Sequence, residues 1–456
     1  MKESSVRTTA ALNSSSAICY CFLRMRRREF LAFAAAPLLR GMPVPKIKDI
    51  SVIATEPSGV RLTVVKIQTD QSGLHGYGCA TFTQRADLVV DAVNRYLKPL
   101  LIGKPTDGIE DLWHAMYNSS YWRNGPVLNN AISGVDQALW DIKGRQAGMP
   151  VYELLGGKCR EAALVYRHAS GKEISQTLDQ ARKLMAEGAK AVRLQVGIPG
   201  MAAYGGSGGP RPQGAGTPLV TGPVFEPAPY TRRTLQLFEQ GRKELGGEVD
   251  LLHDVHERLP PRAAVQFAKD MEQYRLFFLE DALSPEDIDY FHEIREHCKT
   301  PLAMGELFNS PHEWMPLIKG RLIDYIRVHV SQSGGLTPAR KIAALGEACQ
   351  VKTAWHGPGD VSPVGHCANI ALDVACYNFG IQEWSGMGER EQAVFEGCPQ
   401  MKDGYVYPNE KPGWGIEVNE AEAAKYPYGT FERGEHKRLN GGWGEVRRAD
   451  GTIINQ

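Results

Sequence analysis

The chain has 456 residues, which is enough for two or three domains or for one barrel with additions. Lysine plus arginine and aspartate plus glutamate each total 52, so the overall charge does not point to nucleic acid or to an acidic surface as a partner. Hydrophobic residues make up 43% of the chain and charged residues 23%, proportions that are typical of a soluble enzyme with a large core.

Residues 1–44 are expected to be a leader that stands outside the fold. Arg26 begins a basic cluster, and residues 27–31 match the RRxFL core of a twin-arginine export signal. We therefore expect a periplasmic protein, with a disordered basic leader on a cytoplasmic protein as the alternative. Proteins exported by this route fold first, which fits nine cysteines that show no C-x-x-C spacing and so indicate reduced thiols. No later stretch is apolar enough to predict a membrane-spanning helix.

The segment 45–160 is predicted to form an α+β domain, in which a small sheet is followed by helices. Strands are indicated where apolar and polar residues alternate, and helices where apolar residues recur every three or four positions. The helix at 129–148 has the clearest pattern, with Ile132, Val135 and Leu139 on one face. The predicted elements are strands at 47–57 and 62–69, a turn at 73–78 into a third strand, and helices at 86–101, 108–117 and 129–148.

Between residues 161 and 395, strands alternate with helices. Seven or eight such units predict a parallel sheet, and in one block they favour a closed (β/α) barrel over a doubly wound sheet. The strands are expected at 163–170, 191–197, 249–256, 276–282, 301–307, 324–330 and 351–357. The helices are expected at 175–188, 231–247, 261–274, 285–298, 310–320 and 337–350.

A segment rich in glycine and proline, 198–229, interrupts this alternation. Because it follows a predicted strand, it should lie on the barrel face that carries active sites. We expect a partly ordered active-site flap, with idle disorder as the alternative. The last segment, 396–456, is expected to complete the first domain.

Three acidic residues end three successive predicted strands: Asp254, Glu280 and Glu306. They are spaced 26 residues apart, about the length of one strand–helix unit, so we expect them at the same height on the C-terminal rim of the barrel. Adjacent carboxylates repel one another unless a cation neutralises them, and a set of oxygen ligands favours Mg²⁺ over zinc or copper. The alternative is that each acid caps the helix that follows it.

His256 lies two residues beyond Asp254 in the sequence LLHDVHER, residues 251–258. Two residues is the period of a β-strand, so both side chains should point to the same side of the sheet. This arrangement predicts an acid/base group beside the metal, and a polar strand end is the alternative.

Long motifs, in their order along the chain, resemble the enolase superfamily of the mandelate racemase and muconate lactonizing enzyme type. Within it, the chain is most similar to the branch of D-mannonate dehydratases and related acid-sugar dehydratases. The resemblance implies an α/β barrel, a (β/α)₇β modified TIM barrel with an N-terminal α+β capping domain, and one Mg²⁺ bound by Asp254, Glu280 and Glu306. The motifs are residues 133–157, 251–258, 279–283, 301–308, 324–337, 356–365 and 380–384.

The resemblance also implies a mechanism. Mg²⁺ would bind the substrate carboxylate and stabilise the enediolate that forms when the neighbouring proton is removed. His256 would be the general acid for the departing 3-hydroxyl, with a role in orienting a metal ligand as the alternative. The base would be Tyr204, assisted by Arg193, whose positive charge would lower the pKa of the phenol. The alternatives are an exposed loop tyrosine and an arginine that only supports the barrel interior.

Further residues match positions that hold the substrate in the family. Each has a structural alternative; Asp360, for example, is also suited to cap a turn. His329 and His366 are expected to be structural. The residues matched to substrate binding are Thr83, His168, Arg327, His356, Asp360 and Glu383.

Two features depart from the family pattern: Thr83 replaces an asparagine, and the chain ends at Gln456 instead of a tryptophan. The leading prediction is a Mg²⁺-dependent dehydratase of an aldonate such as D-mannonate or D-gluconate, which yields a 2-keto-3-deoxy acid. The alternatives are a hydroxy-acid epimerase or racemase, and a catalytically weak paralogue that binds a sugar acid. The expected partners are a small acid sugar and further copies of the chain, with no nucleic acid.

Overall fold

The structure is a computed structural model that describes residues 44–198, 224–429 and 446–455. The predicted export signal, Tyr204 and Gln456 lie outside the described residues, as does most of the predicted flap. The chain divides into two units, and the description below concerns the second, Lys46–Gln456. None of the helices in the described ranges is long and apolar enough to cross a membrane.

A three-stranded antiparallel sheet packs against a long helix, α6 (Pro126–Ala147), as expected for an α+β capping domain. Glycine residues allow the close approach, because a Cβ on Gly78 would lie 2.0 Å from the carbonyl oxygen of Gly134 on α6. The other elements are β1 (Ile47–Thr55), β2 (Leu62–Thr69), β3 (His75–Cys79), α3 (Ala86–Ala92), η2 (Val93–Leu97), α4 (Lys98–Leu101), α5 (Ile109–Tyr117) and α7 (Val151–Leu154).

The second part is a parallel barrel, which confirms the predicted fold class. Its strands pair in chain order from β4 to β10, and β11 pairs with β4. The strands are β4 (Ala163–Gly171), β5 (Ala191–Val196), β6 (Asp250–Asp254), β7 (Phe278–Glu280), β8 (Leu302–Met304), β9 (Tyr325–Ile326), β10 (Lys352–Thr353) and β11 (Gln382–Glu383).

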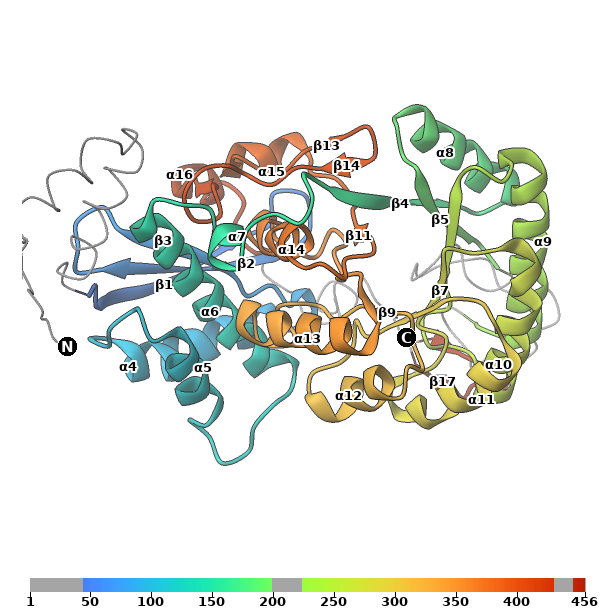
Figure 1. The fold of residues 1–456 in the computed structure, drawn as a ribbon, viewed down its shortest axis with the longest axis horizontal. Helices are drawn as coiled ribbons and strands as arrows, with labels where there is room; N and C mark the ends of the chain where they lie inside the picture. Colours follow the sequence, from blue (N-terminus) through green and yellow to red (C-terminus); the bar gives the residue numbers. More distant parts are fainter. Residues whose placement is uncertain (1–43, 199–223, 430–445, 456) are drawn as a thin grey trace, which may run out of the picture. The chain divides into compact units, whose positions relative to one another are not determined.

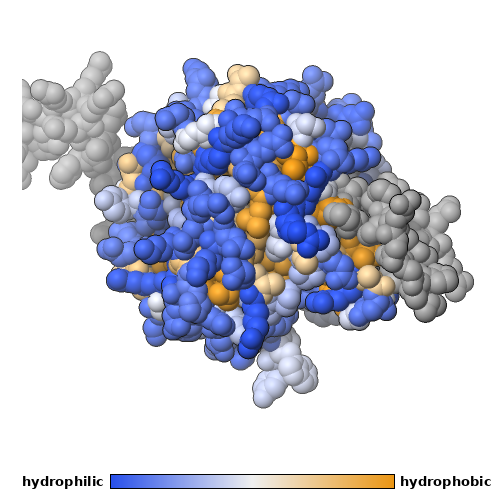
Figure 2. Space-filling view, turned by 90° about the vertical axis from the view of Figure 1, so that its right-hand side faces the viewer, coloured by the Kyte–Doolittle hydropathy of each residue, from blue (hydrophilic) through white to orange (hydrophobic). Residues whose placement is uncertain are grey.

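Helices cover the outside of the strands (Figure 1). Each turns an apolar face inward; the buried residues of α10, for example, are Ala264, Val265, Phe267, Ala268 and Met271. The side with α8, α9 and α10 faces the viewer in Figure 2, where hydrophilic residues dominate and hydrophobic residues show only in small areas. The helices are α8 (Ile174–Ala186), α9 (Pro227–Leu245), α10 (Pro261–Met271), α11 (Phe291–His297), α12 (Pro311–Lys319), α13 (Leu336–Cys349) and α14 (Pro363–Ala375).

Several element boundaries differ from the sequence-based expectation. Helix α9 begins at Pro227, inside the segment predicted as a loop, because the extended Glu226 and a proline in the first turn start it early. Strand β6 ends at Asp254, two residues before the predicted end, because His256 and Glu257 adopt left-handed φ angles of 55° and 63°. Strand β8 also ends early, before Gly305 with its φ of 139°.

The C-terminal segment contacts both the capping domain and the barrel. Strand β14 (Tyr405–Val406), in a hairpin with β13 (Met401–Lys402), pairs antiparallel with β4 of the barrel. Thr55 of β1 donates its hydroxyl to the carbonyl oxygen of Ala423 at 3.0 Å, which fixes α16 (Glu420–Ala423) on the capping sheet. The remaining short elements are α15 (Glu389–Val394), β12 (Phe395–Glu396), β15 (Glu417–Val418), β16 (Val446–Arg447) and β17 (Ile453–Ile454).

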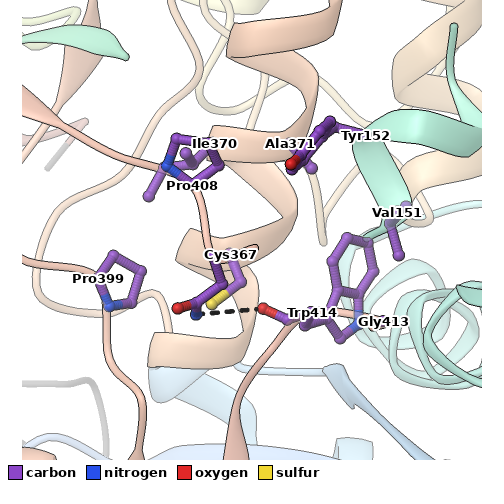
Figure 3. A pocket seen from close by; sticks show the side chains of 10 residues that line it. Val151, Tyr152, Cys367, Ile370, Ala371, Pro399, Pro408, Gly413 and Trp414 are labelled. Atoms are coloured by element: carbon purple, nitrogen blue, oxygen red, sulfur yellow. Dashed lines mark hydrogen bonds between the residues drawn. The ribbon is translucent and has the colours of Figure 1, made fainter. Parts of the chain in front are cut away.

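Asp141, on α6, holds the capping sheet and the C-terminal segment together. Its buried carboxylate accepts hydrogen bonds from the backbone N–H groups of Tyr77 and Trp414, both at 2.9 Å. The carboxylate also forms an ion pair with Arg145, whose Nε lies 3.1 Å away. Burial raises the pKa of Asp141, and the positive charge of Arg145 opposes that rise. The indole of Trp414 packs near Val151 and Cys367 in this junction (Figure 3).

Asp141→Ala should therefore destabilise the protein strongly, because it leaves two buried N–H groups without their acceptor and removes one of the two carboxylate partners of Arg145. We expect a loss of about 3–5 kcal/mol, measured as a lower urea midpoint. Asp179→Ala removes the exposed ion pair with Arg182 and is the control, with an expected loss below about 1 kcal/mol. Equal midpoints for the two variants would contradict this role of Asp141.

Candidate active site

The predicted metal ligands lie at the C-terminal ends of barrel strands, but only two of them are level. Asp254 and Glu280 are the last residues of β6 and β7 and pair with each other in register. Glu280 pairs with Ala303, so Glu306 lies three residues further along the chain than this partner and beyond the end of β8. The expectation that all three acids stand at the same height was wrong for Glu306, because the left-handed Gly305 turns the chain after the strand.

His256 reaches the carboxylates, although not for the reason that the sequence suggested. It lies in a left-handed turn after β6, so the period of a strand does not set its direction. Its backbone N–H donates to Oδ1 of Asp254 at 2.8 Å, which fixes the turn. Its Nε2 then lies 3.5 Å from Oε1 of Glu306. The turn therefore brings the imidazole next to Glu306, one of the predicted metal ligands, while the backbone of His256 is fixed to Asp254, another of them.

Arg193, on β5, points into the barrel and contacts three carboxylates with one nitrogen. Its Nη1 lies 3.2 Å from Asp254 Oδ2, 3.1 Å from Glu280 Oε1 and 3.3 Å from Glu383 Oε1. The side chains of all three acids are fully buried, and that of Arg193 is 6% exposed. This guanidinium therefore partly neutralises a group of charges that water does not screen.

Arg327 directly follows β9 and is the second cation of the site. Its side chain is fully buried. Its Nη2 forms a short ion pair with Glu280 and lies 3.2 Å from both Glu306 Oε2 and Glu383 Oε2. Burial raises the pKa of Glu306 to about 8, with Asp254 adding to the rise and Arg327 opposing it. Burial would also raise the pKa of Glu383, but Arg327 and His356 outweigh it and hold this pKa well below its usual range.

Asp281 is a buried acid of the site that the sequence analysis missed. One oxygen each of Asp254, Glu280 and Asp281 lie within 4.8 Å of one another, an arrangement able to hold a metal ion. Asp281 Oδ1 accepts a hydrogen bond from the backbone N–H of Gly305 at 3.1 Å, and within the described residues its Oδ2 has no hydrogen-bond partner. The sequence could have indicated this residue, since Asp281 directly follows the predicted metal ligand Glu280.

With its acids ionised, the site as a whole carries more negative than positive charge. Five buried acids, the four that contact the two arginines and Asp281, surround two guanidinium groups. Hard oxygen ligands with surplus negative charge are what Mg²⁺ requires, so the donor set fits the predicted ion. The acids are Asp254, Glu280, Asp281, Glu306 and Glu383.

A row of histidines continues the site on the other side of Glu383. The Nε2 of His168, on β4, lies 2.8 Å from Glu383 Oε1, and the Nε2 of His356 lies 3.3 Å from Glu306 Oε2. His329, which is expected to be structural, lies in the same row, with its Nδ1 2.8 Å from Nδ1 of His356. Burial lowers the pKa of all three imidazoles, which favours their neutral form.

The other two residues predicted to bind substrate, Asp360 and Thr83, and the histidine expected to be structural, His366, are placed as follows. Asp360 lies with His329 and His356 in a group whose ligand atoms are within 4.8 Å of one another. Thr83 is buried at the start of the short turn η1 (Thr83–Arg85) of the capping domain. His366 packs edge-on against Trp384.

Two further polar residues support the carboxylates and were not predicted. Gln195 donates from Nε2 to the carbonyl oxygen of Asp254 at 2.7 Å, and the hydroxyl of Tyr166 donates to Glu280 Oε2 at 3.3 Å. Each is two residues away, on the same strand, from a predicted site residue, Arg193 or His168. The period of two residues along a strand could therefore have identified both.

Two protein-family models match the chain. The mandelate racemase/muconate lactonizing enzyme N-terminal domain matches residues 42–156, and the enolase C-terminal domain-like model matches residues 176–422. Together they span the capping domain and the barrel.

Curated relatives and solved structures agree with these models. A D-galactonate dehydratase family member of Pantoea ananatis, RspA, is 48% identical over 422 residues, covering 89% of this chain and 98% of the relative. A D-galactonate dehydratase family member of Enterococcus gallinarum is 47% identical over 409 residues, covering 89% and 98%. The crystal structure of an enolase from Pantoea ananatis with bound D-gluconate and Mg matches with a TM-score of 0.85 and 46% identity, covering 90% of this chain and all of that one.

The bond between Asp281 and Gly305 predicts that Asp281 positions Glu306 for metal binding. Asp281→Asn keeps a carbonyl oxygen for the N–H of Gly305, so its Mg²⁺ affinity, measured by calorimetry, should stay within about threefold of the wild type. Asp281→Ala should weaken Mg²⁺ binding by about 10–100-fold. Glu306→Gln serves as the reference for a lost ligand. Equal losses in the Asn and Ala variants would show instead that the charge of Asp281 itself is needed.

Proposed function

Because the chain belongs to the enolase superfamily, we propose that it is a Mg²⁺-dependent sugar-acid dehydratase whose substrate is an aldonate of the D-gluconate or D-mannonate type. The observation that carries the proposal is the group of buried carboxylates, in excess over two arginines, at the C-terminal ends of the barrel strands. The names of the curated relatives and the D-gluconate and Mg bound to the enolase from Pantoea ananatis support the same reaction class.

Asp254, Glu280 and Glu306 are proposed to hold the ion. Bound there, Mg²⁺ would supply positive charge next to the substrate carboxylate. This charge would stabilise the negative charge that develops when the proton on the adjacent carbon is removed. Arg193 and Arg327 fix the three acids in place from the barrel interior. They thereby reduce the repulsion that would otherwise separate these acids.

His256 is proposed to protonate the leaving hydroxyl. In a dehydration the base takes the proton from C2, the bond from C3 to its oxygen breaks, and the oxygen leaves as water with a proton from the acid. The imidazole of His256 is well placed to be this acid, since its Nε2 lies 3.5 Å from Glu306, its backbone is fixed to Asp254 and its side chain is 13% exposed. The proposed base is Tyr204, with Arg193 lowering the pKa of its phenol.

The hydroxyl chain of the substrate is proposed to lie along His168, His356 and Asp360, with Thr83 approaching from the capping domain. Neutral imidazoles suit this task, because each has one donor and one acceptor nitrogen. A substrate hydroxyl would replace a contact that the imidazole now makes with Glu306 or Glu383. Glu383 fixes this side of the site by accepting the N–H of Gly357 at 3.0 Å and contacting His168.

A panel of acid sugars separates this proposal from its alternatives. D-gluconate, D-mannonate and D-galactonate are each incubated with the protein and Mg²⁺ in deuterium oxide, and the products are followed by NMR. A 2-keto-3-deoxy acid from any of them is the expected result. Deuterium at C2 without loss of the 3-hydroxyl would indicate an epimerase or racemase. Saturable binding without turnover would indicate a sugar-acid-binding paralogue.

His256→Asn tests the assignment of the acid. We expect dehydration to fall by about 10²–10⁴-fold, while exchange of the C2 proton with deuterium continues, because the base is a different residue. Glu296→Gln, on the exposed side of α11, is the control and should leave both rates unchanged. If exchange stops together with dehydration, His256 is itself the base.

A further inference from the structure

Two cysteines from distant parts of the sequence meet where the barrel closes. The segment between α7 and β4 runs along the C-terminal end of α14. Cys159 donates its backbone N–H to the carbonyl oxygen of Val374 at 2.7 Å and its thiol to that of Ala375 at 3.0 Å. Arg160 donates from Nη1 to the carbonyl oxygen of Cys376 at 2.6 Å. The two segments, one before β4 and one after α14, are therefore fixed side by side at this point.

The hydrogen bond to Ala375 limits the distance between the two cysteines. The peptide group that contains the carbonyl oxygen of Ala375 leads directly to Cys376. Standard peptide geometry then places Sγ of Cys159 no more than about 6 Å from Cα of Cys376. Adding the length of the Cys159 side chain puts the two Cα atoms at most about 9 Å apart. Disulfides join residues whose Cα atoms are about 4.4–6.8 Å apart, so rotation of the two side chains and an approach of the two segments by no more than a few ångströms brings the sulfurs within bonding range.

We propose that Cys159 and Cys376 form a disulfide when a small-molecule disulfide, such as oxidised glutathione, is present. In the structure both thiols are free. The cysteine spacing of the sequence indicated reduced thiols, because nothing in it places these two residues together. The proposal is independent of the reaction that the barrel catalyses.

The order of the two chemical steps follows from the exposure of the thiols. Cys159 is exposed, so its thiolate attacks one sulfur of oxidised glutathione and releases one glutathione thiolate. Cys376 then loses its proton, attacks Sγ of Cys159 and releases the second glutathione. Two protein thiols are oxidised, one disulfide is reduced to two thiols, and two protons leave the protein.

The second step should be the slow one. Burial raises the pKa of the Cys376 thiol to about 12, with Asp373, Cys159 and Glu347 adding to the rise and Arg160 opposing it. A mixed disulfide between Cys159 and glutathione should therefore accumulate first and then convert to the internal disulfide.

The cross-link would join the two strands that close the barrel. Cys159 precedes β4 by four residues, and Cys376 precedes β11 by six. Strands β4 and β11 pair with each other and carry His168 and Glu383 of the site. The disulfide would close a loop of roughly 220 residues, so it should raise the melting temperature by about 5–10 °C.

The test uses the full chain, incubated with oxidised glutathione and then digested without reductant. We expect mass spectrometry to find the peptides of Cys159 and Cys376 linked, two fewer free thiols, and a higher melting temperature that a reductant reverses. Cys159→Ser should abolish the link, and Cys376→Ser should leave glutathione bound to Cys159. Cys367→Ser is the control, because it removes a buried thiol on the same helix and should leave the link intact.

Three results would overturn the proposal. The first is a wild-type protein that keeps glutathione on Cys159 without closing the ring. The second is a link from Cys159 to any cysteine other than Cys376. The third is an equal rise in melting temperature in the wild type and in Cys159→Ser.

Discussion

The burial of five acids beside two arginines is the constraint on which the rest of the site depends. Charges removed from water are costly unless opposite charges and hydrogen bonds replace the solvent. Arg193 and Arg327 reach most of these acids from the barrel interior and compensate only part of their charge. The surplus is the property that makes the group a binding site for a divalent cation, because the ion supplies the charge that the protein lacks.

The closure of the barrel brings the two halves of this site together. Glu383 is the last residue of β11 and pairs with Tyr166 of β4, the strand that carries His168. Through Glu383 the carboxylates near Asp254 are connected to the histidines near His356. These contacts therefore join the proposed metal ligands to the proposed hydroxyl-binding residues in one network.

The fold class could be predicted from the sequence, because it depends on spacing along the chain, whereas most of the candidate site residues came from the resemblance to the enolase superfamily and stay predictions. The equal steps between Asp254, Glu280 and Glu306 indicated strand ends of a barrel, and the family match confirms that fold. The spacing could not predict that Glu306 lies beyond the end of its strand, since that offset comes from the left-handed Gly305. For His256 the predicted proximity is found, but a turn produces it instead of the strand period.

The periodicity of apolar residues could not predict contacts between segments that are far apart in the sequence. The pairing of β14 with β4, and the hydrogen bond of Asp281 to Gly305, depend on how the whole chain folds. The same is true of Cys159 and Cys376, which no local pattern connects. Tyr204 stays a prediction, because it lies outside the described residues.

The most direct test of the account is a crystal structure of the protein with Mn²⁺, whose anomalous scattering identifies its position. The account predicts one strong peak at coordination distance, about 2–2.3 Å, from oxygens of Asp254, Glu280 and Glu306. A protein without a peak among these acids, or with its only peak at His329, His356 and Asp360, would contradict the claim that the buried carboxylates form the metal site.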